Sequence, residues 1–537
     1  MPCVNFRSVT GRQVRVVEAQ GGESVMRAAV RSGVPGIVGE CGGELNCGTC
    51  HAYVDDAWVD RVPPKRVEES ELLEVLDDSM PGSRLTCQIP ITDDVDGLTL
   101  TVPSWEEPAS APAPDSASGH VLDQCRFDVV IVGAGHGGTQ LATALAQRSP
   151  ELRVALVSSE DSIPYDRPSL SKAYLLGEAS LEEIRLRPAA YWDAAGVELV
   201  LGDAVVEVDA TQRLVRTASG RALGYNSLVW AAGGRARPLP DEVAQAPYLT
   251  LRGLADAEQL QQMLASAKHV TLIGGGYIGL EAAAVLRSRT IDVTLIEAQE
   301  RLLARVTGSA VSDFFAAEHR RAGVDVRLGR TVMRVSRSAN HEQTDVLLDD
   351  GSSLTTDLVV AGIGMVPNVE ALERAGAEVG NGVVVDEYCK TSLPNVYAIG
   401  DCAAHHNRFA RGRIRLECVQ NAVDQAKVVE GVILGERKPF EAVPWFWSNQ
   451  FEIRLKSAGI VGDADSTVVR RYPETGAFSV AYFRGEDLVA VDAINAPGDY
   501  AKLRQAIRDG SRVDQVVLAD TSTDIAAAIR VHIPATT

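Results

Sequence analysis

The chain has 537 residues, of which 45% are hydrophobic and 23% are charged, and its formal net charge at pH 7 is -20. This length predicts three or four domains, and the acidic balance argues against a nucleic-acid-binding protein, which needs a basic surface. Because the chain has no run of about 18 apolar residues and begins without the apolar core of a signal peptide, we expect a cytoplasmic protein that does not cross a membrane.

Residues 1–104 predict a small α+β domain. VNFRSV and RQVRVVEA are strand-like runs joined at a Thr-Gly turn, and SVMRAAVRSG predicts a short helix with Ser24 as its N-cap. A second helix is predicted over VEESELLEVLDD, with acidic residues from 68 to 78. The domain contains 16 acidic and 9 basic residues, a net charge of -7. A charged helix is most often a solvated surface, although it can also dock a partner.

Four cysteines in this domain predict an iron–sulfur site. Cys41, Cys47 and Cys50 form a C-x5-C-x2-C run, and Cys87 follows in SRLTCQI. Four thiolates, two for each iron, are the ligands of a 2Fe-2S cluster. The C-x2-C pair could also be half of a zinc site or a redox dithiol, but zinc normally uses a second close pair and Cys87 stands alone. Glycines that allow the loop to wrap tightly are Gly42, Gly43 and Gly48.

The segment 105–125, SWEEPASAPAPDSASGHVLDQ, predicts a flexible linker. Pro, Ala and Ser dominate it, and it has no apolar period. Some 20 extended residues reach roughly 60–70 Å. The linker would therefore hold the joined domains at an effective concentration on the order of millimolar.

A dinucleotide-binding loop opens the next domain, in FDVVIVGAGHGGTQLATALAQR. An apolar strand leads into Gly133, Gly135 and Gly138, and a helix follows. The first glycine allows the turn, the second admits a pyrophosphate, and the third permits close packing of helix on strand. The phosphates would lie at the N-terminus of the helix.

The same pattern recurs in HVTLIGGGYIGLEAAAVLRSR, with Gly274, Gly276 and Gly279. The next strand, DVTLIEAQ, ends at Glu297, where an acidic side chain accepts hydrogen bonds from a ribose 2′-OH and repels a 2′-phosphate. This pattern favours NADH over NADPH. Arg301 lies four residues further on and could instead reach a phosphate, so the preference stays open.

Two such loops predict two dinucleotides, and FAD followed by NAD is the usual arrangement in flavoproteins of this kind. The segment NVYAIGDCA places Asp401 after an apolar strand, where such proteins hold the flavin ribityl chain. Taken alone, Asp401 could simply cap the following helix. Together with two glycine loops it supports an FAD site.

Residues 126–537 resemble the putidaredoxin reductase-like, oxygenase-coupled NADH–ferredoxin reductases, and residues 1–104 resemble the adrenodoxin/putidaredoxin-type 2Fe-2S ferredoxins. The stretches that carry the first resemblance are PYDRPSLSKAYL, GGGYIGLEAA, TLIEAQERLLARV, AGIGMVPN, AIGDCA, RLECVQNAVDQA and PWFWSNQFEIRLK. The chain is thus identified as a fusion of two proteins that are normally separate.

The resemblance implies an α/β fold class with an α+β N-terminal domain: a β-grasp ferredoxin followed by a two-Rossmann flavoprotein. The implied domains are the ferredoxin at 1–104, the linker at 105–125, the FAD-binding domain at 126–250 and 370–439, the inserted NAD-binding domain at 251–369, and a C-terminal α+β interface domain at 440–537.

The resemblance also implies individual cofactor contacts. For FAD these are Gly137, Ser159, Lys172, Val205, Arg252, Asp401 and Val419, and for NAD they are the second glycine loop, Glu297 and Gly364. Relatives often have an acidic residue at or beside position 159, so Glu160 or Asp161 could make the ribose contact. Trp447 is a candidate for contact with the flavin ring, although a tryptophan in an apolar run is more often a core residue.

Lys172 and Glu281 are the implied catalytic pair. In the family these two residues meet beside the flavin N5, where hydride arrives. Such a pair could orient the nicotinamide and stabilise charge on the reduced flavin. Sequence alone favours an ordinary surface or helix position for each.

The predicted function is electron transfer from NADH through FAD to the cluster and on to a separate terminal oxygenase. A cytochrome P-450 is the first expectation for the acceptor and a Rieske-type oxygenase the second. Residues 126–388 contain no cysteine, so a dithiol relay is not expected. Two other classes stay open: a flavin NADH oxidase or peroxidase with a structural or sensing cluster, and an interaction protein like apoptosis-inducing factor. We expect a monomer or homodimer in which the ferredoxin docks on its own reductase.

Overall fold

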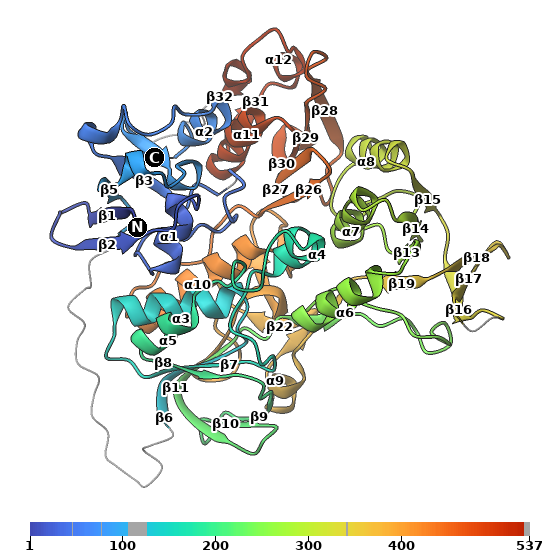
Figure 1. Ribbon diagram of the computed structural model, residues 1–537, viewed down its shortest axis with the longest axis horizontal. Coiled ribbons are helices and arrows are strands. Elements are labelled where there is room, and N and C mark those ends of the chain that lie inside the picture. The colour runs from blue at the N-terminus through green and yellow to red at the C-terminus, as the bar shows by residue number, and fades with distance from the viewer. Residues whose placement is uncertain (46, 77, 106–125, 340–341, 531–537) are drawn as a thin grey trace.

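The computed structural model describes residues 1–45, 47–76, 78–105, 126–339 and 342–530. The predicted linker lies outside the described residues except for Trp105. Figure 1 shows the N-terminal domain beside the C-terminal domain, with the two dinucleotide domains below and to one side. No helix among the described residues is long and apolar enough to span a bilayer.

The N-terminal domain is built on a mixed five-stranded sheet in the order β2-β1-β5-β3-β4. Strand β1 pairs with β5 in parallel and with β2 in antiparallel orientation. Ser24 caps the first helix by accepting a hydrogen bond from the Arg27 amide, as its sequence predicts. The elements are β1 (Cys3–Ser8), β2 (Val14–Glu18), α1 (Val25–Arg31), β3 (His51–Val54), α2 (Val67–Leu73), β4 (Ser83–Leu85) and β5 (Leu98–Val102).

The acidic helix α2 is shorter than predicted, because it ends at Leu73. Beyond it, the chain turns so that Leu76 covers the loop that carries Cys41, Cys47 and Cys50, called the cluster loop below. A Cβ at Gly48 in this loop would lie 2.8 Å from the Leu76 side chain. The helix is also less solvated than predicted. Glu69 is fully buried, where it accepts hydrogen bonds from the Arg84 guanidinium and the Leu85 amide.

The FAD-binding domain has a mostly parallel sheet in the order β8-β7-β6-β11-β10-β9, with β23 also paired to β11. Strand β7 and most of β6 are buried, as expected for parallel strands covered on both faces. Helices α3 and α10 pack against each other. The elements of this sheet are β6 (Arg126–Val132), α3 (His136–Arg148), β7 (Val154–Val157), η5 (Arg167–Ser171), α4 (Ala173–Leu176), α5 (Ala189–Ala194), β8 (Val197–Val200), β9 (Val205–Asp209), β10 (Leu214–Thr217), β11 (Ala222–Trp230), β23 (Val396–Ala398) and α10 (Val419–Ile433).

Two smaller sheets complete this part of the chain. One pairs β12 with β20, and the other has the order β21-β22-β24-β25. Their strands are β12 (Gly234–Ala236), β20 (Met365–Pro367), β21 (Val379–Gly380), β22 (Gly382–Val385), β24 (Ala403–Asn407) and β25 (Gly412–Ile414), with helix α9 (Glu370–Arg374) between the two sheets in sequence.

The NAD-binding domain repeats the strand–loop–helix arrangement on a parallel sheet in the order β15-β14-β13-β19. A separate antiparallel sheet has the order β16-β17-β18. The elements are α6 (Leu254–Leu264), β13 (His269–Ile273), α7 (Tyr277–Ser288), β14 (Asp292–Glu297), α8 (Ser309–Arg321), β15 (Val324–Leu328), β16 (Val332–Arg337), β17 (Thr344–Leu348), β18 (Ser353–Thr356) and β19 (Leu358–Ala361).

The C-terminal domain is an antiparallel sheet in the order β26-β27-β30-β29-β28, with α11 packed against β30. Its strand β26 also packs against α7 of the NAD-binding domain. The elements are β26 (Trp445–Gln450), β27 (Ile453–Gly459), β28 (Ser466–Arg471), β29 (Phe478–Arg484), β30 (Asp487–Ile494), α11 (Pro497–Asp509), β31 (Arg512–Val513), α12 (Gln515–Ala519) and β32 (Ile529–Arg530).

Candidate functional site

The four predicted cluster cysteines come together in the N-terminal domain as two pairs. The Cys47 and Cys41 sulfurs lie 3.2 Å apart. Cys50 is hydrogen-bonded to Cys87, and Cys87 also accepts a hydrogen bond from the Gln88 amide. Two pairs of thiols, one pair for each iron, are the arrangement that a 2Fe-2S cluster requires.

The loop wraps as its glycines predicted. Gly42, Gly43 and Gly48 all have positive φ, at 65°, 106° and 72°. This left-handed conformation costs glycine little. Leu45 adopts it as well, with φ of 54°, and its carbonyl faces the C-terminal domain.

The surroundings of two of the four thiols, Cys47 and Cys50, shift their pKa values upward. Burial, followed by the neighbouring Cys41, raises the pKa of Cys47. The hydrogen bond with Cys87, followed by burial, raises the pKa of Cys50. Such thiols stay protonated at neutral pH unless a metal supplies positive charge.

The first glycine loop joins β6 to α3. Gly133 has φ of 113°, and a Cβ there would lie 2.1 Å from the Ala231 carbonyl oxygen. A Cβ at Gly138 would lie 1.9 Å from the Gly133 carbonyl oxygen, and one at Gly137 would lie 3.1 Å from that of Ala422. Gly135 forms the N-cap of α3 and faces open space apart from Arg167. A side chain would therefore clash with backbone at Gly133 and Gly138, whereas space remains at Gly135, where a phosphate would lie at the N-terminus of α3.

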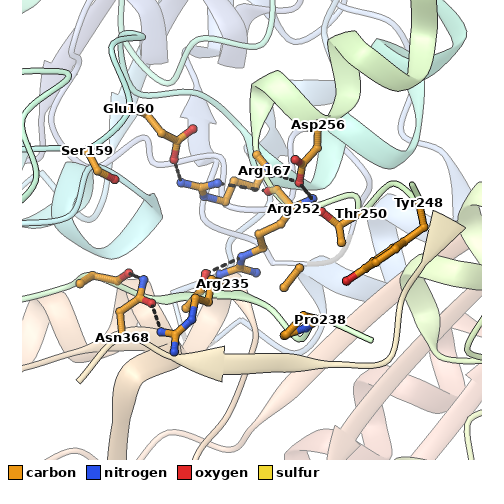
Figure 2. Close-up of a pocket in the computed structure, with 14 residues that line it drawn as sticks. Ser159, Glu160, Arg167, Arg235, Pro238, Tyr248, Thr250, Arg252, Asp256 and Asn368 are labelled. Atoms are coloured by element: carbon orange, nitrogen blue, oxygen red, sulfur yellow. Dashed lines mark hydrogen bonds and ion pairs between the residues drawn. The ribbon is translucent and has the colours of Figure 1, made fainter. Parts of the chain in front are cut away.

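A cavity of about 400 Å³ lies beside this loop. Figure 2 shows Glu160 bonded to Arg167 on one side of it and Asn368 bonded to Arg235 on the other. Arg252, which also lines the cavity, donates a hydrogen bond of 2.8 Å to Asp401. Each of the three guanidinium groups is paired with a carboxylate, Arg167 with Glu160, Arg252 with Asp401 and Arg235 with Glu370, so a dinucleotide pyrophosphate would share them with these side chains.

Some of the residues predicted to contact FAD line this cavity, and others do not. Ser159, Glu160 and Arg252 line it, and Asp401 adjoins it through Arg252. The alternative ribose contact, Asp161, instead packs beside Gly202. Predicted contacts that are not among the cavity-lining residues are the glycines of the first loop, including Gly137, Lys172 after η5, Val205 at the start of β9 and Val419 at the start of α10.

Arg167 is a candidate cofactor residue that the sequence reasoning missed. Its guanidinium binds Glu160 and the Arg252 carbonyl oxygen. Burial raises the pKa of Glu160, but Arg167 and the Tyr165 hydroxyl outweigh it and hold that pKa below its usual value. The only sequence feature that could have indicated Arg167 was its position in PYDRPSLSK, five residues before Lys172.

The second glycine loop joins β13 to α7 and has the same geometry. Gly274 has φ of 112°, and a Cβ at Gly279 would lie 2.2 Å from the Gly274 carbonyl oxygen. Gly276 is the N-cap of α7, with nothing within 4 Å of a Cβ built there. Glu297, at the end of β14, accepts a hydrogen bond of 2.6 Å from the Gly275 amide. The predicted acidic residue therefore lies at the loop.

Two more residues border the predicted NAD site. Arg301 donates hydrogen bonds to the Thr307 and Ala304 carbonyl oxygens and to the Ser312 hydroxyl. Its guanidinium is thus already bound within the protein, which weakens the alternative of a 2′-phosphate contact. Gly364 has φ of 104° and lies beside the Arg305 guanidinium.

Lys172 and Glu281 meet as the resemblance implies. The Lys172 ammonium donates a hydrogen bond of 2.6 Å to Glu281 Oε2, and the Ser171 hydroxyl donates to the same oxygen at 2.8 Å. The Glu281 side chain is 5% exposed. Lys172 follows η5 of the FAD-binding domain and Glu281 lies in α7 of the NAD-binding domain, so the pair joins the two dinucleotide domains.

The cluster loop lies against the reductase part of the chain. Glu40 Oε1 accepts a hydrogen bond of 3.0 Å from the Lys427 ammonium, and Glu44 accepts one of 2.8 Å from the Asn449 amide. The buried Lys456 ammonium donates to the Leu45 carbonyl oxygen at 2.7 Å. Three side chains of the reductase therefore hold the six residues from Glu40 to Leu45.

Apolar packing supports these polar contacts. Cys41 and Cys47 belong to one buried cluster with Trp445 and Trp447 of β26. The rings of the two tryptophans lie 5.5 Å apart. Trp447 is buried on the ferredoxin side of β26, and its contact with the flavin ring stays a prediction.

Two further contacts surround the cluster loop. Helix α2 packs against α11, and a Cβ at Gly498 would lie 3.0 Å from the Glu71 carboxyl carbon. The Gln147 amide donates to the Gly33 carbonyl oxygen, beside the Tyr191 ring. The docked surface thus includes the end of α1, the cluster loop and part of the acidic helix α2.

Comparison with known proteins agrees with this architecture. Residues 127–426 match the family model described as pyridine nucleotide-disulphide oxidoreductase. Residues 445–529 match the reductase C-terminal model, and residues 8–92 match the 2Fe-2S iron-sulfur cluster binding domain.

Individual relatives match the reductase part of the chain. The 5,5'-dehydrodivanillate O-demethylase ferredoxin reductase subunit of Sphingobium sp. is 48% identical over 402 residues, which cover 74% of this chain and 97% of the relative. Putidaredoxin reductase CamA of Pseudomonas putida is 40% identical over 403 residues, 74% of this chain and 96% of the relative. The crystal structure of the covalent putidaredoxin reductase–putidaredoxin complex matches with a TM-score of 0.72 and 39% identity, covering 75% of this chain and 99% of that chain.

These matches define a flavoprotein oxidoreductase of the pyridine nucleotide-disulphide oxidoreductase family, to which the chain belongs. Within that family it is a putidaredoxin reductase-like ferredoxin reductase with a 2Fe-2S domain fused to its N-terminus. Its cofactors are a 2Fe-2S cluster, FAD and NAD(P)H.

Proposed function

We propose that the chain carries electrons from NADH through FAD to its own 2Fe-2S cluster and then to a separate terminal oxygenase. FAD supplies the conversion of a two-electron hydride into single electrons, which the cluster accepts one at a time. The observation that carries the proposal is the docked cluster loop, with Cys41 and Cys47 packed beside Trp447 of the reductase.

The Cys87→Ser variant tests whether the cluster is the exit for electrons. We expect it to retain NADH-dependent reduction of ferricyanide, which takes electrons from the flavin, and to lose reduction of cytochrome c. Retained cytochrome c reduction would favour a flavin oxidase or peroxidase with a structural or sensing cluster. Absorbance of the cluster in the same samples shows how much of it the variant retains.

An interaction protein like apoptosis-inducing factor is the second alternative. In such a protein, NADH would drive dimerisation or formation of a long-lived complex with little turnover. Contacts between the cluster loop and the reductase favour electron transfer, because a binding switch needs no one-electron exit. Size-exclusion chromatography with and without NADH, beside steady-state turnover, separates the two functions.

The terminal electron acceptor is a further part of the proposal. We place a cytochrome P-450 first and a Rieske-type oxygenase second. Relatives of this chain are named for an O-demethylase system and for putidaredoxin reduction, which supports an oxygenase as the acceptor class. Reconstitution of NADH-dependent substrate oxidation with purified members of each class decides between them. We further propose that the protein works in the cytoplasm as a monomer or homodimer.

The docked arrangement also bears on how electrons leave. Cys41 and Cys47 are at most 9% exposed in it. An oxygenase that approaches the cluster loop therefore meets a surface that the reductase already covers. We infer that the ferredoxin domain receives electrons docked and delivers them after it has left this position on its linker.

A further inference from the structure

Strand β26 has two different faces, because successive side chains of a strand point to opposite sides. Trp445, Trp447 and Asn449 face the ferredoxin domain. Phe446 instead stacks on Tyr277 of α7, with ring centroids 4.2 Å apart. The second face of β26 is thus directed toward the dinucleotide domains.

A chain of buried hydrogen bonds runs from this second face to Glu281. The Ser448 hydroxyl donates to Glu281 Oε1 at 2.7 Å, and the Gln450 amide nitrogen lies 3.1 Å from the Ser448 oxygen. Gln450 Oε1 lies 2.9 Å from Nε2 of His319 in α8. Ser448, Gln450 and His319 are each at most 1% exposed.

The donor and acceptor of each hydrogen bond between His319 and Glu281 follow from the carboxylate of Glu281. An ionised Glu281 can only accept, so Ser448 must donate to it. Ser448 then accepts from the Gln450 amide, and the Gln450 carbonyl oxygen accepts from the Nε2–H of His319. Burial lowers the pKa of His319, which keeps the ring neutral, and its Nδ1 has no partner among the described residues. Every hydrogen bond in this series therefore donates in the direction of the Glu281 carboxylate.

Glu281 consequently has a separate partner for each oxygen. Oε2 accepts from Lys172 and Ser171, and Oε1 accepts from Ser448. Without Ser448, the carboxylate would lose the contact that fixes its rotation and would leave a buried oxygen without a donor. Unpaired buried oxygens are costly, so the side chain would be expected to move.

We propose that Ser448, supported by Gln450 and His319, is a positioning residue for the Lys172–Glu281 pair. This inference rests on the proposed role of that pair in hydride transfer. A small displacement of a positioned group lowers the rate of a reaction much more than it lowers binding. Ser448 therefore acts on the rate of flavin reduction and leaves NADH binding at Glu297 and the second glycine loop unchanged.

Anaerobic stopped-flow reduction of the flavin by NADH is the first test. We expect Ser448→Ala to lower the limiting rate constant by about tenfold or more while the NADH concentration for half-saturation changes by less than about threefold. Ser448→Thr, which keeps the hydroxyl, should recover most of the rate. His319→Phe should have a smaller effect than Ser448→Ala, because it removes only the outer support.

Ser479→Ala is the matched control. Ser479 is also buried in the C-terminal domain and donates to a buried carboxylate, that of Asp499, at 2.6 Å. We expect it to lower stability without slowing flavin reduction. Equal slowing by Ser448→Ala and Ser479→Ala would contradict the proposal, because it would reflect a general disturbance of the domain.

A second readout does not depend on turnover. Urea unfolding of the holoenzyme, with Ser448→Ala, Glu281→Gln and the double variant, forms a double-mutant cycle. We expect non-additive changes in the free energy of unfolding, and additive changes would contradict the direct contact. If Lys172→Met and Glu281→Gln slow flavin reduction while Ser448→Ala does not, this inference is wrong and the role of the pair stands. If neither Lys172→Met nor Glu281→Gln slows it, the role of the pair is wrong and the inference falls with it.

Discussion

Glu297 is the residue on which we expect the choice of nicotinamide dinucleotide to depend. Its carboxylate lies at the second glycine loop, bonded to the Gly275 amide, and there it would repel a 2′-phosphate. We expect Glu297→Gln to lower the ratio of kcat/KM for NADH over that for NADPH by about 10- to 100-fold. Glu300→Gln, which removes an exposed carboxylate from the segment that follows β14, should leave the ratio unchanged. A wild-type preference for NADPH in steady-state turnover would contradict the role given to Glu297.

The Lys172–Glu281 pair gives the second prediction at this scale. Its 2.6 Å bond spans the FAD- and NAD-binding domains, so loss of either partner releases a contact between them. We expect Lys172→Met and Glu281→Gln each to slow flavin reduction by NADH on the order of 10- to 100-fold. Lys268→Met, at the edge of the NAD-binding domain, is the control and should keep the wild-type rate. Wild-type rates in both variants would contradict a role for Lys172 and Glu281 in flavin reduction.

Residues were predictable from the sequence where their chemistry depends on near neighbours. The cysteines at 41, 47 and 50 and both glycine loops were predicted from spacing, because each works within a few residues of chain. Arg167 and Ser448 were missed. Ser448 acquires its role only when folding brings it to Glu281, 167 positions away, and no local pattern records such a contact.

At the scale of elements, the dock between the cluster loop and the reductase combines apolar packing on β26 with polar contacts from α10 and β26. Lys427 is 43% exposed and pairs with Glu40, so salt should weaken this contact. We expect Lys427→Ala and Asn449→Ala together to slow cluster reduction by roughly threefold to tenfold at low salt, with a smaller difference at high salt. Lys438→Ala, an exposed lysine after the end of α10, is the control. The measurement is stopped-flow reduction of the cluster at several ionic strengths, and equal rates for all variants would contradict the observed dock.

Element types were better predicted than element ends. Both Rossmann units, the opening hairpin and α1 form where the sequence places them. The acidic helix was predicted to continue through Asp78 but ends at Leu73, because Leu76 leaves the helical path to cover Gly48 of the cluster loop. The docked face of α2 was also unpredictable in detail, since its partner α11 lies more than 400 residues further along the chain.

At the scale of the whole molecule, we expect the docked ferredoxin domain to leave its dock before it delivers electrons to another protein. A crosslinker that contains a cleavable disulfide, attached to cysteines introduced for Glu71 and Gly498, should hold the domain docked, because the Glu71 carboxyl carbon lies 3.0 Å from a Cβ built at Gly498. We expect the crosslinked variant to reduce its cluster with NADH at the wild-type rate and to lose most cytochrome c reduction. Treatment with dithiothreitol should restore that activity. Full cytochrome c reduction in the locked state would show that electrons leave without undocking.

We infer that the fused cluster is reduced by the flavin of its own chain. The direct measurement is the rate constant for cluster reduction after rapid anaerobic mixing with excess NADH, over a tenfold range of protein concentration. Because the predicted linker would hold the domains at an effective concentration on the order of millimolar, we expect the same rate constant at every micromolar concentration tested. A rate constant that rises in proportion to protein concentration would contradict it.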